Sequence, residues 1–206
     1  QYYCAHMRSG KVDGGVLQHI ETVSKSSFRI DARHGFAHPA IEEGFKFFIP
    51  AAKSYGVAAM SICNSYNAAT LGFHTGFLAR AGLLGIGATN AVPNLAPVGG
   101  KIPIIGTNPF SYAVPAPRGK IAFLVDQSAT QVAWTAIKRA ADAGENIPLG
   151  WALDTYGIPT QNAQAGLDGS MAPSGGSKGF NMGLFRRSFM FCACWRKTWA
   201  RAGLVY

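Results

Sequence analysis

The chain has 206 residues, of which 48% are hydrophobic and 14% charged, a composition typical of a folded globular protein and unlike that of a disordered one. It contains no apolar run of the roughly 18 residues that a transmembrane helix needs, and its N-terminus lacks the pattern of a signal peptide. The net charge of +9 suggests nucleic-acid binding, but five basic and no acidic residues lie in 186–206, so the basicity belongs to the tail and we expect no nucleic-acid or membrane partner.

The N-terminal part alternates helical and strand-like segments. Residues 1–35 are expected to hold a helix end, a glycine-rich turn and a short strand near Ser27–Asp31. Apolar spacing over Ala40–Ala59 predicts a helix, which Pro50 should kink or restart because proline lacks a backbone donor. The β-branched and small residues of Val57–Ile62 then predict a strand.

A second helix is predicted over Asn67–Ala81, with Asn67 as its N-cap and Gly82 as its stop. The following segment, Leu83–Thr89, is strand-like.

Two further strands are predicted at Phe110–Val114 and Ile121–Val125, before a helix over Ala129–Ala143 that Gly144 should end. Segments rich in glycine and proline at 148–150, 157–159 and 171–179 predict loops. Because strand and helix signals alternate, we expect a mixed α/β fold.

The four cysteines do not form a metal or redox motif. Only Cys192 and Cys194 lie close together, and their spacing suits neither a zinc knuckle nor a redox Cys-x-x-Cys pair. Without a visible secretion signal, we expect reduced thiols and a cytoplasmic location. The missing initiator methionine suggests a chain that starts partway through a longer protein.

The strongest functional signal is a polar loop over Ala96–Pro109, which contains the motif Gly106-Thr-Asn-Pro. Its glycines allow positive φ or close approach of the backbone to a ligand, Thr107 and Asn108 add a hydroxyl and an amide, and Pro109 fixes the chain. We therefore predict a small-molecule site at this loop.

Nucleotide-binding fingerprints of the common kinds are absent. No Gly-x-Gly-x-x-Gly follows a strand and no Walker-type Gly-Lys-Ser/Thr occurs, so an ordinary Rossmann site is excluded. Three other polar turns remain open to two interpretations. Asn64–Asn67 is either a phosphate site at a helix N-terminus or a plain capping turn, and Asp126–Thr130 either contacts ribose or substrate or caps a helix. The glycine loop Pro173–Gly179 presents one lysine, either to a phosphate or carboxylate or as a simple surface turn.

The histidine pair His34 and His38 is spaced four residues apart, which on a helix could share a metal ion. Gly35 and Pro39 make a helix there doubtful. Ordinary loop histidines are the favoured interpretation, and we expect no metal.

Several motifs occur together in a characteristic order. They are Asn64-Ser-Tyr-Asn, Ala96-Pro-Val-Gly-Gly, Gly106-Thr-Asn-Pro, Asp126-Gln-Ser, Ile147-Pro-Leu-Gly-Trp-Ala-Leu-Asp154, Gly157-Ile-Pro-Thr160 and the glycine loop. In this order and spacing, over roughly residues 1–184, the chain resembles the malate/L-lactate dehydrogenase type 2 family. That family includes sulfolactate and ureidoglycolate dehydrogenases and the Δ1-piperideine-2-carboxylate reductases.

The resemblance implies a mixed-sheet, non-Rossmann NAD(P)-binding domain and part of a second, dimerisation domain, in a homodimeric oxidoreductase. It implies hydride transfer between NAD or NADP and a small 2-hydroxy/2-oxo acid such as malate, lactate or sulfolactate, with a cyclic ketimine acid as the alternative substrate. Thr107 is expected to touch the substrate. The resemblance places at the cofactor Asn67, Ala68, Ala69, Thr70, Leu71, Asp126, Gln127, Ser128, Ser177 and Lys178.

The chain departs from the family pattern in three places. Tyr66-Asn67 replaces a histidine pair of many relatives and is closer to the hydroxyacid branch. The expected acid/base histidine lies before residue 1, and no histidine of this chain sits in a matching motif, so an inactive nucleotide-binding fragment is a further alternative. After about residue 185 the sequence changes to Arg, Trp and Cys, which suggests a shifted reading frame or, alternatively, a genuine basic helix of an interaction protein. We expect a partial dimerisation segment over 1–55, the NAD(P)-binding domain over 56–184 and the divergent tail over 185–206.

Overall fold

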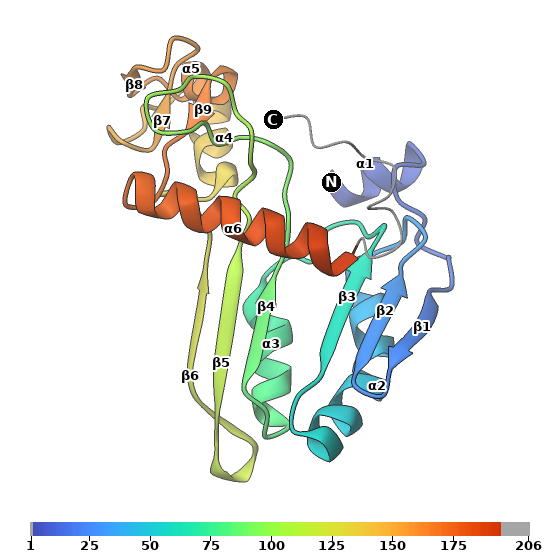
Figure 1. Cartoon of the computed structure of the whole chain (residues 1–206). Helices are drawn as coiled ribbons and strands as arrows, with labels where there is room; N and C mark the ends of the chain where they lie inside the picture. The colour runs from blue at the N-terminus through green and yellow to red at the C-terminus, as the bar shows by residue number, and fades with distance from the viewer. Residues whose placement is uncertain (1, 195–206) are drawn as a thin grey trace. The chain divides into compact units, whose positions relative to one another are not determined.

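A computed structural model describes residues 2–194 of the chain (Figure 1). The chain divides into two compact units. The first unit takes the described residues of Gln1–Ile86, Tyr112–Val125 and Phe191–Tyr206, and the second unit takes Gly87–Ser111 and Asp126–Met190. This division follows spatial contacts, and the predicted assignment of functional domains stays a prediction.

The first unit opens with helix α1 (Tyr2–Arg8) and contains a three-stranded mixed sheet. Strand β2 (Ser27–Asp31) pairs antiparallel with β1 (His19–Ser24) and parallel with β3 (Ala59–Cys63). A parallel neighbour requires a crossover connection, and helix α2 (Ala37–Tyr55) provides it. The strand predicted at 27–31 is confirmed, and so, shifted by up to two residues, is the strand predicted at 57–62.

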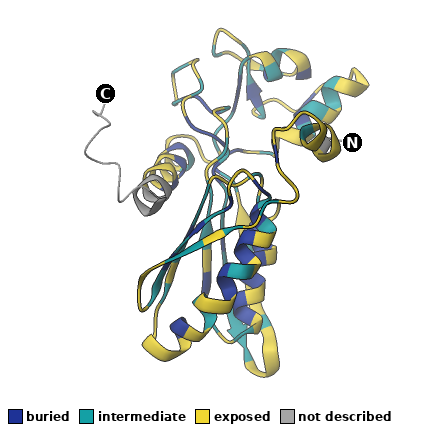
Figure 2. Cartoon of the chain, turned by 90° about the vertical axis from the view of Figure 1, so that its right-hand side faces the viewer, coloured by how far each residue is buried: buried dark blue, intermediate teal, exposed yellow. Residues whose placement is uncertain are grey.

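Helix α2 packs closely on this sheet. A Cβ atom added to Gly44 would lie 2.4 Å from the Met60 sulfur, so a glycine at this position lets the helix approach the strands. Phe28 and Ile30 of β2 form the buried core beneath it. Figure 2 shows that the helices of this unit combine buried and exposed residues.

The restart predicted at Pro50 is wrong, because α2 continues through this residue to Tyr55 and ends at Gly56, which has φ +82°. The alternative, a kink at Pro50, stays a prediction. Proline removes one helical hydrogen bond. Ala51 and Ala52 beyond it are nevertheless buried with the rest of the helix face, so packing outweighs the local penalty.

Helix α3 (Leu71–Arg80) begins later than predicted, with Thr70 at its N-cap. Asn67 is not the cap: its φ is +39° and its side-chain oxygen accepts a hydrogen bond from the Ala69 amide at 2.7 Å. This local Asx turn competes with the helix for the backbone. The predicted stop is close to the observed end, since Gly82 follows at φ +86°.

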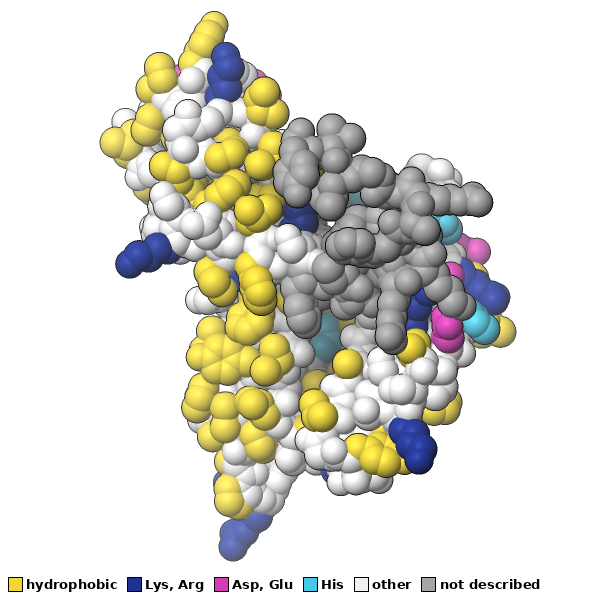
Figure 3. Space-filling view, viewed as in Figure 1, with side chains coloured by type: hydrophobic (Ala, Val, Ile, Leu, Met, Phe, Trp, Pro, Cys, Tyr) yellow, Lys and Arg dark blue, Asp and Glu magenta, His cyan; other side chains and the backbone are white. Residues whose placement is uncertain are grey.

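A second sheet has the order β4-β5-β6, formed by Gly85–Ala88, Phe110–Ala116 and Lys120–Gln127. A short 3₁₀ turn, η1 (Pro117–Gly119), joins the last two strands. Side chains of Ile121 and Leu124 lie 3.3 and 3.2 Å from a Cβ added to Gly76 of α3. Hydrophobic side chains gather over β5 and β6 (Figure 3), where Phe123 is 52% exposed. All three strands were expected, so these predictions are confirmed.

The second unit contains short strands in the order β8-β7-β9, formed by Pro159–Thr160, Ala152–Leu153 and Ser170–Met171, all antiparallel. They pack with α4 (Trp134–Ala143) and α5 (Ala163–Asp168). The largest fully buried side chains of its core are Leu95, Ile105, Ile137, Ile147 and Met171.

The helix predicted from Ala129 begins only at Trp134, and Gly144 ends it as predicted, with φ +69°. Thr130 is the reason for the late start, because its hydroxyl donates to the Val132 carbonyl at 2.8 Å and the residue bridges to Pro173. Asp126 is likewise not a helix cap, since it lies within β6.

Helix α6 (Ser177–Cys194) was not expected. The loop predicted over 171–179 therefore ends early, and Ser177, Lys178 and Gly179 form the first turn of this helix. The backbone continues helically across the predicted change at about residue 185 as far as Cys194, and the choice between a shifted reading frame and a genuine basic helix stays a prediction. The remaining residues of the predicted tail lie outside the described residues.

Candidate functional site

Asn108 is the centre of the Gly106–Pro109 loop, and it is fully buried. Its side-chain oxygen accepts from the Ala91 amide at 3.0 Å, and its side-chain nitrogen donates to the Gly183 carbonyl at 3.0 Å. Its φ is +36°, a conformation that asparagine tolerates better than most residues. Asn108 therefore anchors the loop from inside, and its amide is not available to a ligand.

Gly106 serves the same packing. A Cβ atom there would lie 2.3 Å from the Ala91 carbonyl oxygen, so no other residue fits without movement of the backbone. The close approach that the sequence suggested for this glycine is thus an approach of the chain to itself.

Thr107 lies where three predicted segments meet in the second unit. Its carbonyl accepts from the Ala129 amide at 2.7 Å, and the Ala129 carbonyl accepts from the Ser174 amide at 2.9 Å. The structure thus brings together the Gly106–Pro109 loop, the end of β6 and the glycine loop. The Thr107 side chain is half-buried.

The segment after β6 is ordered by its own hydroxyls. Ser128 Oγ lies 2.9 Å from Thr130 Oγ1, and Thr130 in turn bonds to the Val132 carbonyl. Asp126 and Gln127 have exposed side chains at the end of the strand. This arrangement presents a carboxylate and an amide next to the point where the three segments meet.

The glycine loop leads directly into α6 through two residues with positive φ, Gly175 at +68° and Gly176 at +62°. A Cβ on Gly179 would lie 1.8 Å from the Ser174 carbonyl oxygen, so the loop closes tightly over the first helical turn. That turn has no acidic residue and contains Ser177 and Lys178. The first amides of a helix have no acceptor within it, and together with a hydroxyl and an ammonium they suit a phosphate group.

The segment Asn67–Leu71 belongs to the first unit. Asn67 donates to the Tyr3 hydroxyl at 3.1 Å, and Ala69 has φ +50°, which is uncommon for a residue with a side chain. The Ala68 carbonyl is 3.1 Å from His74 Nε2, which must be the donor because a carbonyl only accepts. Leu71 is buried at the start of α3. The segment is thus held in an unusual conformation by side-chain contacts.

His6 and Tyr66 form a pair that the sequence did not suggest. His6 Nδ1 on α1 lies 2.5 Å from the Tyr66 hydroxyl, beside Asn67. Their rings are perpendicular, with centroids 5.5 Å apart. The two residues are 60 positions apart in the chain, so only the fold could reveal the contact.

The two histidines considered as a metal pair lie in different local structures. His34 has φ +65° in a turn, whereas His38 lies in the first turn of α2 and not in a loop as expected. Among the described residues, no three His, Cys, Asp or Glu side chains lie in positions to hold a metal ion together. Across the same part of the chain, no helix is long and apolar enough to span a membrane.

The fold is a mixed α/β architecture, and known proteins share it. The family model described as malate/L-lactate dehydrogenase matches residues 1–189. The chain belongs to the malate/L-lactate dehydrogenase family, and its resemblance to that family is confirmed.

Relatives of this chain include both dehydrogenases and reductases. A (2R)-3-sulfolactate dehydrogenase (NADP(+)) of Chromohalobacter salexigens is 42% identical over 183 residues, 89% of this chain and 54% of the relative. A Δ1-pyrroline-2-carboxylate reductase of Ancylobacter novellus is 37% identical over 86% of this chain and 52% of the relative. The chain thus spans about half the length of these relatives.

Solved structures agree with the fold. The Δ1-piperideine-2-carboxylate reductase of Pseudomonas syringae superposes with a TM-score of 0.84 at 32% identity, over 89% of this chain and 55% of that one. A sulfolactate dehydrogenase of Methanocaldococcus jannaschii superposes with a TM-score of 0.79 at 27% identity, over 91% and 54%. The expected mixed-sheet α/β fold of this family is therefore confirmed.

Proposed function

We propose that this chain is the nucleotide-binding part of an NAD(P)-dependent oxidoreductase that acts on a small 2-hydroxy or 2-oxo acid. The observation that supports this most directly is the meeting of Thr107, the end of β6 and the glycine loop at the N-terminus of α6. When bound, the nicotinamide would supply the acceptor or donor of a hydride.

The cradle at α6 fits the phosphates of such a cofactor. Ser177 and Lys178 stand in a helical turn without acidic residues, and Gly175 and Gly176 leave room for close approach of the backbone. The cofactor roles of Asp126, Gln127 and Ser128 in the second unit, and of Asn67, Ala68, Ala69, Thr70 and Leu71 in the first, remain proposals supported by family membership. So does the substrate contact of Thr107.

Oxidation of a hydroxy acid also releases the hydroxyl proton, which a general base must accept. The family resemblance implies a histidine that lies before residue 1, and this stays a prediction. A homodimeric state, a cytoplasmic location and the use of NAD or NADP are likewise part of the proposal. The relative at 42% identity is named for NADP(+), which favours NADP over NAD.

A cyclic ketimine acid is the second candidate substrate. Several curated relatives, 33–37% identical to this chain, are named as Δ1-pyrroline-2-carboxylate reductases or as reductases of both Δ1-pyrroline- and Δ1-piperideine-2-carboxylate. Both reactions transfer a hydride to or from the carbon next to a carboxylate, so the same cofactor site serves either.

Titration of the chain with NADH and NADPH, followed by nucleotide fluorescence, tests the proposal. We expect saturable binding, with a dissociation constant raised about 5–10-fold in Lys178→Ala through loss of a charged hydrogen bond to phosphate. Lys138→Ala is the matched control, because Lys138 is paired with Asp142 on α4. The proposal is contradicted if neither NADH nor NADPH binds saturably. Turnover by a longer chain that includes the predicted histidine, with sulfolactate, malate and lactate against Δ1-pyrroline-2-carboxylate, then distinguishes the two substrate classes.

A further inference from the structure

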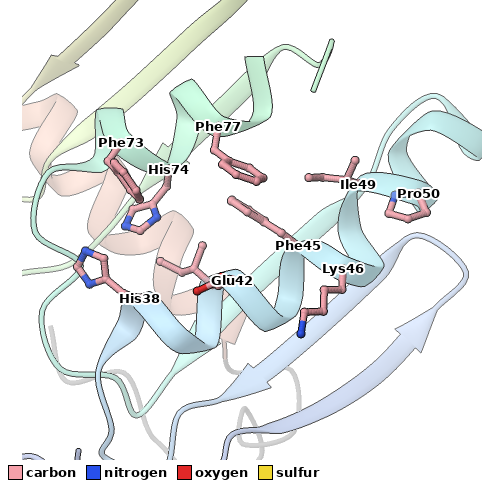
Figure 4. A pocket seen from close by; sticks show the side chains of 10 residues that line it. His38, Glu42, Phe45, Lys46, Ile49, Pro50, Phe73, His74 and Phe77 are labelled. Carbon is pink, nitrogen blue, oxygen red and sulfur yellow. The ribbon is translucent and has the colours of Figure 1, made fainter. Parts of the chain in front are cut away.

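A groove in the first unit lies between α2 and α3, and none of the residues assigned to the cofactor or substrate above lines it. Its volume is about 660 Å³, within the range of small-molecule sites. Figure 4 shows side chains of the two helices facing each other across it. The groove is mostly apolar, with a few polar groups at one end and along its rim.

Three phenylalanines give the groove its character. Phe45 and Phe77 stack with ring centroids 5.6 Å apart and planes at 15°. Phe73 is 66% exposed and Phe77 is 50% exposed. Aromatic faces left open to water favour a ligand with an apolar body, and they also attract cations.

Two histidines lie together at one end of the groove, His38 on α2 and His74 on α3, with ring centroids 4.9 Å apart (Figure 4). His74 is buried, and this burial lowers its pKa. Since its Nε2 donates to the Ala68 carbonyl, Nδ1 is left as an acceptor. The buried histidine therefore offers a lone pair rather than a positive charge.

The charged residues of the groove do not balance. Lys46 Nζ is 2.5 Å from Glu43 Oε1, so its charge is offset by that neighbour. Among the described residues, no hydrogen bond or ion pair engages the carboxylate of Glu42, which lies one helical turn from both His38 and Lys46. Glu42 and Lys46 line the groove and Glu43 stands beside Lys46, so these three side chains together carry a formal charge of −1.

We propose that this groove binds a small organic amine, with its ammonium group at Glu42 and its aromatic or alkyl body against Phe45, Phe73 and Phe77. An organic cation fits better than a metal ion, because His38, His74 and Glu42 do not lie in positions to ligate one ion together. The inference is independent of the proposed oxidoreductase function.

Isothermal titration of the chain at pH 7.5 with 4-phenylbutylamine, 4-phenylbutanol and 4-phenylbutanoate tests the charge preference. We expect the amine to bind with a dissociation constant of about 0.1–1 mM, typical of a ligand of this size. The alcohol should bind roughly 3–10-fold more weakly, since it lacks the ion pair and the cation–π contact. No saturable heat with the amine, or equal or tighter binding of the carboxylate, overturns the proposal.

Variants locate the site. Glu42→Gln removes the charge while keeping the shape and should raise the amine's dissociation constant about 3–5-fold. Glu145→Gln removes the same charge in the second unit and should leave it unchanged. Phe77→Ala should weaken all three ligands, and circular dichroism shows whether each variant keeps its fold. Equal effects of Glu42→Gln and Glu145→Gln would mean non-specific attraction and would refute the site, even if Phe77→Ala failed to fold.

Discussion

Asn108 should be among the residues on which the stability of the second unit depends most. Replacement by alanine removes the hydrogen bonds to Ala91 and Gly183. The half-buried Ala91 amide then loses its acceptor, at a cost of about 1–2 kcal/mol, and the Gly183 carbonyl keeps its partner within α6, so its loss is nearer 1 kcal/mol. Alanine at φ +36° adds about 1 kcal/mol.

The total expected for Asn108→Ala is therefore about 3–4 kcal/mol, and in a chain of this size each kcal/mol lowers Tm by roughly 2–4 °C. Asn108→Gly loses the same hydrogen bonds but relieves the backbone strain, so it should be about 1 kcal/mol less destabilised. Urea unfolding followed by circular dichroism and fluorescence measures both changes.

The control is Asn90→Ala, since Asn90 is exposed in the same region and should change stability by less than about 0.5 kcal/mol. Stability of Asn108→Ala within about 1 kcal/mol of the parent would refute the reasoning. It would show that water replaces the side chain of Asn108 and that the loop does not depend on it. If Asn108→Gly lowered the free energy of unfolding by as much as Asn108→Ala, only the contribution assigned to backbone strain would be refuted.

Three further outcomes are expected. Arg186 is 4% exposed, its Nε has no partner among the described residues, and desolvation lowers its pKa. Arg186→Met should therefore stabilise the chain by about 1 kcal/mol in urea unfolding despite the lost bond to the Asn108 carbonyl, whereas the exposed Arg187→Met should be neutral. Burial lowers the pKa of His74 in the folded chain. As the pH falls below about 6.5, the His74 side chain therefore becomes protonated in the unfolded chain before it does so in the folded chain. Stability should thus be full above that pH and fall below it, and a His74→Gln variant with an equally steep fall would contradict this. Gly179→Ala places a Cβ 1.8 Å from the Ser174 carbonyl. It should cost about 2–3 kcal/mol and weaken NADH binding in the fluorescence titration, and unchanged binding would argue against the phosphate cradle.

Periodic segments were predictable because their pattern is local. The strand over Ser27–Asp31 and the C-terminal end of α4 at Gly144 follow from residue type and from a glycine that accepts positive φ. Helix starts were less predictable. Asn67 and Asp126 are good capping residues, yet one forms an Asx turn and the other continues a strand, because neighbouring segments compete for the same backbone groups.

The candidate site was predictable only in part. Sequence motifs pointed to Thr107 and Lys178, and the structure brings the Thr107 loop and the glycine loop to the same place through Ala129. The structural role of Asn108 was not predictable, since both side-chain partners lie far away in the chain, at Ala91 and Gly183. The contacts His6–Tyr66 and His38–His74 could not be predicted from the sequence for the same reason.

By itself, the sequence determined the alternation of strands and helices, the absence of an ordinary dinucleotide fingerprint and the membership of the malate/L-lactate dehydrogenase family. Those properties depend on short stretches of residues and on the order of motifs. Only the tertiary structure decided that Pro50 lies inside a helix, that Asn108 is a buried anchor and that Lys178 lies in the first turn of a helix. The physical reason is that these outcomes depend on which distant groups satisfy a hydrogen bond or cover an apolar face, and a linear pattern carries no information about such partners.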